Sequence, residues 1–331
     1  MYWDGRKVLV AGGAGFVGSY VVENLVRRGA RVTVADNFSR GRLENLSSVV
    51  NQVQIVKCNL INWFACQTVC RDIDVVFNAA AKVTGIEYNR HHHADMFYNN
   101  MLLQMNVPRM AMESGVRKFV QVSTACIYGH DVNVPTGEWE AEVIDPEPTN
   151  YGYGLAKHAG EKFALFCAEE SSMEVVVARF FNAVGVRDYY DEETSHVVPA
   201  LIRRVLSGES PLVVWGTGTQ SRSFVDARDL AEGLVLLAEK ALNKSVVNIG
   251  HDREITIRDL AQLVCRVCGK SDLPTVFDTT KPNGYERRAA NITALKSITN
   301  GWYPQIPLEE TVSLMVEEYK QKYLKERGNG R

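Results

Sequence analysis

Short apolar runs alternate with helical patterns through the first half of the chain, and this alternation limits the folds open to it. The apolar runs are rich in β-branched residues, as buried parallel strands are. They cover residues 7–11, 31–35, 53–57, 75–79, 118–123 and 174–179, and helical patterns lie near 17–28, 96–114 and 154–168. The pattern predicts an α/β fold class, a doubly wound parallel sheet with helices on both faces.

The regular alternation of strands and helices ends at about residue 185, and the predicted elements after it are shorter. Helices are expected near 197–207, 228–242, 257–268 and 308–324, with a strand near 212–214. We therefore expect residues 1–185 to form mainly the sheet domain and 186–325 mainly a smaller C-terminal lobe, with the two interleaved. The polar residues 326–331 are expected to be a flexible tail.

Composition narrows the class of protein. The chain has 331 residues, 46% of them hydrophobic, which is ample for a large core. A net charge of −2 provides no broad field for nucleic acid or an acidic membrane. No apolar run approaches the roughly 18 residues of a membrane span, so a cytoplasmic protein is expected.

Cysteine and histidine usage predicts neither a disulfide framework nor a metal site. Seven cysteines are an odd number in a long chain. Cys265 and Cys268 form a CxxC pair without the second pair that a zinc site needs. The run His91-His92-His93 consists of neighbours whose side chains diverge on a helix, so a solvated surface is the expected role.

A glycine-rich turn follows the first predicted strand. Gly12, Gly15 and Gly18 have GxxGxxG spacing between a strand and a helix. Missing side chains let the backbone approach a pyrophosphate, and the helix N-terminus offers N–H groups to it. Asp36 ends the second strand, where a carboxylate can accept both ribose hydroxyls of an adenosine. Asp36 favours NAD because it repels a 2′-phosphate, although Arg40 and Arg42 leave NADP open.

A second motif carries acid–base chemistry. Tyr153 and Lys157 are four residues apart on one helix face. An ammonium there is expected to lower the pKa of the phenol, which then acts as a base toward a substrate hydroxyl. Thr124, at the end of the fifth strand, is expected to hydrogen-bond the same substrate oxygen.

With these motifs in this order, the chain resembles the extended short-chain dehydrogenases/reductases of the nucleotide-sugar epimerase and dehydratase group. Further matching pieces are Phe77-Asn78-Ala79-Ala80-Ala81, Arg179-Phe180-Phe181-Asn182, residues 215–222 and Val247-Asn248-Ile249-Gly250. The resemblance implies a Rossmann domain that binds NAD(P), oxidation of a sugar usually at C4, and a homodimer formed through two helices. It implies cofactor contacts from Gly12, Gly15, Phe16, Val17, Asp36, Asn37, Ser39, Arg40, Ala79, Ala80, Ala81 and Lys157, and substrate contacts from Lys82, Asn182, Arg187, Arg222 and Arg287.

Local features resemble two branches of this group. Residues 79–86 and 97–101 are similar to GDP-fucose synthase, and Ser123-Thr124-Ala125-Cys126 is similar to both GDP-fucose synthase and GDP-mannose 3,5-epimerase. In those enzymes the cysteine exchanges protons at C3 and C5 of a 4-keto sugar, so Cys126 is a catalytic candidate. However, Arg187 occupies the place of the second acid/base, a histidine, in GDP-fucose synthase, and arginine does not release its proton at working pH.

Several functions therefore stay open at this point. The first is an NAD-dependent epimerase that oxidises C4 transiently, by C4 inversion or by C3/C5 exchange through Cys126. The second is an NADPH-dependent epimerase-reductase of a 4-keto-6-deoxy sugar, and the third is a non-enzymatic NAD(H) sensor. The substrate nucleotide is GDP, UDP, CDP or dTDP.

Overall fold

A seven-stranded parallel sheet forms the centre of the protein, in the order β11-β6-β5-β4-β1-β2-β3. The computed structural model describes residues 2–142, 145–146, 148–192, 194–281 and 284–324. The strands are β1 (Lys7–Ala11), β2 (Arg31–Asp36), β3 (Gln54–Lys57), β4 (Val75–Asn78), β5 (Lys118–Thr124), β6 (Glu174–Phe180) and β11 (Ser245–Ile249). The doubly wound α/β fold is thus confirmed, and the first six strands agree with the predicted runs to within a residue or so at each end.

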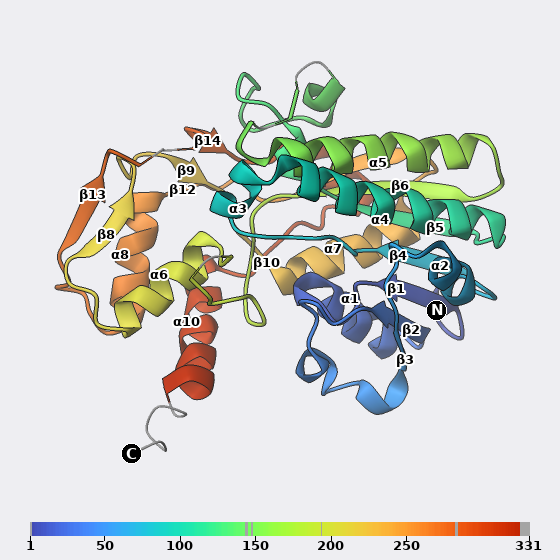
Figure 1. The fold of residues 1–331 in the computed structure, drawn as a ribbon, viewed down its shortest axis with the longest axis horizontal. Coiled ribbons are helices and arrows are strands. Elements are labelled where there is room, and N and C mark those ends of the chain that lie inside the picture. The colour runs from blue at the N-terminus through green and yellow to red at the C-terminus, as the bar shows by residue number, and fades with distance from the viewer. Residues whose placement is uncertain (1, 143–144, 147, 193, 282–283, 325–331) are drawn as a thin grey trace.

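Two helical layers cover the sheet (Figure 1). The lower layer in that view holds α1 (Phe16–Arg27) and α7 (Ala227–Lys240), and the upper holds α4 (His93–Glu113) and α5 (Tyr151–Glu169). The short helix α2 (Trp63–Val69) packs against α4. Strand β1 is buried on both faces: Val8 and Val10 join the core under α1, and Leu9 and Ala11 join the core under α4. This alternation explains why the strands are almost entirely apolar.

The C-terminal lobe has its own core between α6 (Val197–Leu206), α8 (Ile257–Val267) and α10 (Leu308–Tyr319). Its strands are short: β8 (Leu212–Trp215) pairs with β13 (Thr275–Asp278), and β7 (Ala183–Val184) pairs with β10 (Val225–Asp226). A three-stranded sheet joins β12 (Ile255–Thr256), β9 (Ser221–Arg222) and β14 (Arg287–Arg288). The remaining helices are α3 (Ile86–His91) and α9 (Thr293–Ile298), and a π-helical segment, Lys320–Leu324, follows α10.

The chain returns to the central sheet after entering this lobe. Helix α7 packs against α1, and β11 pairs with β6 at the edge of the sheet. Residues 227–249 therefore belong structurally with the first half of the chain, and β11 was not among the predicted strands. The predicted tail, residues 326–331, lies outside the described residues. Among the described helices, none combines the length and the apolar character needed to cross a membrane.

Candidate active site

The carboxyl ends of the parallel strands meet along one edge of the sheet. Strand order reverses between β1 and β4, and in doubly wound sheets ligands bind at this reversal. The glycine turn, Asp36, residues 79–81 and Thr124 all follow or end strands at this edge. The topology therefore brings together the residues that sequence analysis assigned to cofactor and chemistry.

The glycine turn is packed so closely that side chains are excluded from it. Gly12 has a φ of +74°, and a Cβ there would lie 2.9 Å from the backbone nitrogen of Ala80. A Cβ on Gly18 would collide with the carbonyl oxygen of Gly12. Gly15 is the N-cap of α1 and brings no side chain of its own to the helix end. The bare N-terminus of α1, next to Phe16 and Val17, thus fits an anionic pyrophosphate.

Asp36 is held rigidly beside this turn. Its carboxylate accepts hydrogen bonds from the backbone nitrogens of Ala14 (3.0 Å) and Phe38 (2.8 Å). Burial raises the pKa of Asp36, and these hydrogen bonds oppose that shift. Asn37 accepts a hydrogen bond from the nitrogen of Ser39 in the same loop. A carboxylate fixed next to a glycine turn is the arrangement that an adenosine ribose requires, so the residues fit a dinucleotide.

Three candidate catalytic side chains converge where β5 ends. Thr124 shares a hydrogen bond with the phenol of Tyr153, and Cys126 is near enough for its charge to act on that phenol. The Thr124 hydroxyl also accepts a hydrogen bond from the nitrogen of Cys126 (3.2 Å). Gly154 permits this approach, because a Cβ there would lie 2.5 Å from the Cys126 carbonyl oxygen. The cluster contains the acid/base residues that the sequence suggested.

The pKa of Tyr153 shifts in the direction opposite to the one expected from the sequence. Burial raises the pKa of Tyr153, the charge of Cys126 adds to the shift, and only the Thr124 hydrogen bond lowers it. The expected lowering by Lys157 is absent because its ammonium points elsewhere and donates to the carbonyl oxygen of Val122 (2.5 Å). Lys157 is only 2% exposed, and burial lowers its pKa to about 8.

Lys157→Met is expected to change the pH dependence of stability. The pKa of Lys157 falls from 10.5 to about 8 on folding, so below pH 8 the buried charge costs the folded state about 3 kcal/mol. Between about pH 8 and 10.5 the unfolded chain binds more protons, so this cost diminishes as pH rises. Urea unfolding should therefore show that the stability of Lys157→Met relative to wild type declines from pH 7.5 to pH 10.

The matched control is Lys162→Met, which removes an exposed ammonium from the same helix. A stability difference between Lys157→Met and wild type that stays constant from pH 7.5 to 10 would contradict the prediction.

A buried ionic network lies one helical turn beyond Lys157, and sequence analysis missed it. Glu161 and Arg179 form an ion pair at 2.7 Å, with each side chain 1% exposed. Arg179 also donates to the Tyr128 hydroxyl, which donates to Asn248 on β11. Tyr285 donates to the Tyr128 carbonyl oxygen. Arg179 and Asn248 occur in the family-like segments quoted above, but the network draws on five separate parts of the chain.

The predicted substrate residues occupy different surroundings. Lys82 pairs with Asp95 on α4, and Asn182 donates to the carbonyl oxygen of Ser223 (2.7 Å). In the β9–β14 register Arg287 lies opposite Ser221 and Arg288 lies opposite Arg222, so the side chains of Arg222 and Arg287 leave opposite faces of the strand pair. Arg222 donates to the Tyr285 carbonyl oxygen, whereas Arg287 pairs with Glu254.

Arg187 is directed away from this group in the structure. Its guanidinium donates to Ser19 (2.9 Å) and Glu23 (2.7 Å), both on α1. Arg40, a predicted cofactor residue, lies over the ring of Tyr189 with its guanidinium carbon 3.9 Å from the ring centre.

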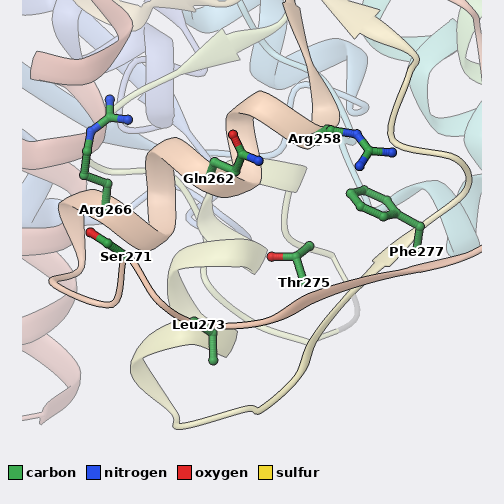
Figure 2. Close-up of a pocket in the computed structure, with 7 residues that line it drawn as sticks. All are labelled: Arg258, Gln262, Arg266, Ser271, Leu273, Thr275 and Phe277. Carbon is green, nitrogen blue, oxygen red and sulfur yellow. The ribbon is translucent and has the colours of Figure 1, made fainter.

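One surface cavity lies elsewhere, between α8 and β13 in the C-terminal lobe (Figure 2). Its volume is about 400 Å³, and Arg258 and Arg266 stand at opposite ends of its helical wall. Arg258 already stacks on Phe277, and Arg266 pairs with Glu309. This cavity is separate from the residues that end the central strands. Within the described residues, no group of three or more histidine, cysteine or acidic side chains is placed to hold a metal ion.

A parallel sheet with a glycine turn, a buried carboxylate beside that turn and a Thr–Tyr–Lys set is typical of the NAD(P)-dependent short-chain dehydrogenases/reductases. The chain belongs to the NAD dependent epimerase/dehydratase family, whose model matches residues 8–250. This finding confirms the resemblance noted in the sequence. The protein is therefore an enzyme of a family that uses NAD(P) and acts on nucleotide sugars.

Individual relatives extend over nearly the whole chain. It is 35% identical to a GDP-L-fucose synthase of Sinorhizobium fredii over 322 residues, which cover 96% of each chain. The structure of UDP-glucose 4-epimerase from Thermotoga maritima with UDP-glucose matches with a TM-score of 0.85 and 29% identity, covering 96% of this chain and 99% of that one. The UDP-glucose 4-epimerase of Thermus thermophilus in complex with NAD matches with a TM-score of 0.80 and 26% identity, covering 96% and 100%.

Proposed function

We propose that the protein is an NAD-dependent epimerase of a nucleotide-linked sugar that acts through transient oxidation at C4. The observation that carries the proposal is the convergence of Thr124, Tyr153 and Lys157 at the sheet edge that also holds the glycine turn. The similarity to UDP-glucose 4-epimerases and GDP-fucose synthases supports a nucleotide-sugar substrate. The nucleotide itself is left as GDP, UDP, CDP or dTDP.

The chain's own residues account for the acid–base steps. When bound, NAD supplies the hydride acceptor and donor, and its positive ring favours the ionised phenol. Tyr153 takes the proton of the C4 hydroxyl and later returns it, and Thr124 hydrogen-bonds the same oxygen. The Lys157 ammonium, which donates to the Val122 carbonyl oxygen, is proposed to hold the nicotinamide ribose rather than to lower the pKa of the phenol. Because hydride leaves and returns at C4, the cycle is redox neutral.

Asp36 supports NAD rather than NADP. A buried carboxylate beside the glycine turn repels the 2′-phosphate of NADP, and the hydrogen bonds from Ala14 and Phe38 hold it there. For the nucleotide diphosphate, Arg222 and Arg287 are the proposed partners, because a guanidinium can bind two phosphate oxygens at once. Asn182 and Lys82 are proposed to line the same substrate site.

A second candidate reaction is proton exchange at C3 or C5, as in GDP-fucose synthase. The position of Cys126 near the Tyr153 phenol favours it. Once C4 is a ketone, the neighbouring C–H protons are acidic, and a thiolate can remove one. Arg187 does not supply the partner acid, since its guanidinium is bound to α1. An NADPH-dependent reductase remains the alternative for a 4-keto-6-deoxy substrate.

Proton NMR in D₂O with a panel of nucleotide sugars and catalytic NAD tests the proposal. A new C4 epimer without deuterium is the expected result. Cys126→Ser should then leave turnover within about twofold of wild type, since C4 inversion does not use the thiol. Deuterium at C3 or C5, abolished by Cys126→Ser, would instead establish the second candidate. No product from any sugar of the panel would contradict a redox-neutral epimerase for those sugars.

We also propose a homodimer formed through α4 and α5. These helices pack side by side on the upper layer of Figure 1 and carry exposed aromatic residues, Tyr98 at 63% and Phe166 at 54%. The family resemblance, which implies a dimer contact through two helices, supports this assignment. Sedimentation velocity of the full chain tests this arrangement, and a monomer would contradict it.

A further inference from the structure

The segment 186–192 connects the C-terminal lobe to the cofactor side of the central sheet. It follows β7 and Gly185. Gly185 packs beside the Phe16 ring, because a Cβ added to this glycine would lie 3.6 Å from the ring. The Tyr20 hydroxyl donates to the Val186 carbonyl oxygen (3.1 Å). Phe16 and Tyr20 belong to the first two turns of α1, whose N-terminus faces the glycine turn. The segment therefore begins beside the site proposed for the pyrophosphate.

Arg187 anchors the segment to α1. Besides its bonds to Ser19 and Glu23, its guanidinium carbon lies 4.0 Å from the centre of the Tyr20 ring. The Arg187 and Glu23 side chains are only 18% and 19% exposed, so the pair is better shielded from water than a surface ion pair. The backbone nitrogen of Arg187 donates to the Glu318 carboxylate on α10. Arg187 thus ties both lobes together at one point.

Tyr189 anchors the middle of the segment to the loop that follows Asp36. Its ring lies under two guanidiniums, with that of Arg40 at 3.9 Å and that of Arg42 at 4.6 Å. Because Arg40 and Arg42 follow Asp36 closely in the chain, the ring lies beside the loop that carries the acid proposed for the ribose. Arg40 also donates to the Thr194 hydroxyl (3.0 Å). The segment therefore extends from the pyrophosphate end to the ribose end of the proposed dinucleotide site.

We propose that residues 186–192 form a latch that retains the dinucleotide between turnovers, with Arg187 and Tyr189 as its two positioning residues. The inference rests on the proposed function, because a redox-neutral cycle benefits from a cofactor that stays bound. It also assigns a role to the arginine that stands where GDP-fucose synthase has a histidine: Arg187 holds the latch on α1 rather than transferring a proton. Release of the dinucleotide requires the contacts of Arg187 and Tyr189 to break.

The rate of cofactor release tests the latch without any sugar. The full-length protein is loaded with NADH, excess NAD is added, and the decay of bound NADH fluorescence is followed. Arg187→Ala is expected to release NADH about tenfold faster than wild type, as the loss of one shielded, hydrogen-bonded ion pair implies. Tyr189→Ala and Glu23→Gln should change the rate in the same direction.

Arg266→Ala is the matched control. It removes an arginine from an exposed ion pair with Glu309 in the C-terminal lobe, outside the proposed latch. It should release NADH at the wild-type rate. Circular dichroism and thermal unfolding identify the variants that remain folded. If folded Tyr189→Ala and Glu23→Gln both release NADH within about twofold of the wild-type rate, the latch is excluded. The latch and the proposed function can fail independently. Faster NADH release by these variants supports the latch even if no sugar of the NMR panel is converted.

Discussion

Tyr153→Phe is expected to lower turnover about 10³-fold while leaving NAD binding and the free energy of unfolding close to wild type. The substitution removes only the hydroxyl that accepts the C4 proton. Thr124 loses this hydrogen-bond partner, while the aromatic ring itself is retained. Single-turnover formation of NADH from a nucleotide sugar, followed at 340 nm, measures the chemical step directly.

Tyr151→Phe is the matched control for this prediction. Tyr151 precedes Tyr153 by two residues on α5, and its fourth neighbour is Leu155 rather than a lysine. It is 36% exposed and should tolerate the loss of its hydroxyl. If Tyr153→Phe turned over as fast as Tyr151→Phe, the acid–base assignment would be wrong. If neither the wild type nor any variant turned over but NAD still bound, the sensor function would become the better description.

The second large effect is expected from breaking the buried Glu161–Arg179 pair. Arg179→Met leaves the Glu161 carboxylate buried without its cation, and removing one partner of such a pair costs roughly 3–5 kcal/mol. The Tyr128 hydroxyl and the Glu138 carbonyl oxygen lose a donor as well. Urea unfolding of Arg179→Met should show this loss of stability, and the midpoint temperature of thermal unfolding should fall in parallel.

The double variant Glu161→Leu/Arg179→Met distinguishes the unpaired charge from simple loss of packing. It should recover a large part of the stability lost in Arg179→Met, because no charge is left buried alone. Equal stability of the single and double variants would show that the ion pair itself is not the source of the effect. Exposed pairs such as Arg109–Glu113 provide the baseline, since water screens their attraction and their loss should cost far less stability than loss of the buried pair.

The sheet and the cofactor turn were predictable because their signals are local. A strand buried on both faces needs a continuous apolar run, and β1 is such a run. Gly12 and Gly18 have no room for a Cβ, so the turn leaves a readable spacing of glycines. Strand β11 was missed because its short run, 245–249, begins with Ser245, contains Asn248 and joins the sheet only at its edge.

The site was predictable in its residue types and less so in its interactions. Tyr153 and Lys157 are four apart on one helix, a spacing that the sequence displays. Lys157 donates to the Val122 carbonyl oxygen and therefore does not lower the pKa of Tyr153. This choice of partner depends on how α5 packs on β5, which the spacing does not reveal. The direction of Arg187, toward α1 and away from the substrate side, depends on a backbone φ of +78° that the residue name does not reveal.

The sequence by itself therefore determined the α/β class, the glycine turn with Asp36, and the Thr124–Tyr153–Lys157 set, because each depends on residues that are near one another in the chain or placed by strand ends. Only the tertiary structure decided the partners of Arg179 and Arg187. Those guanidiniums are satisfied by groups 18 to 168 residues away, such as Glu161 and Ser19. Buried charges take whichever partner the packing of distant elements supplies, and no local pattern encodes that choice.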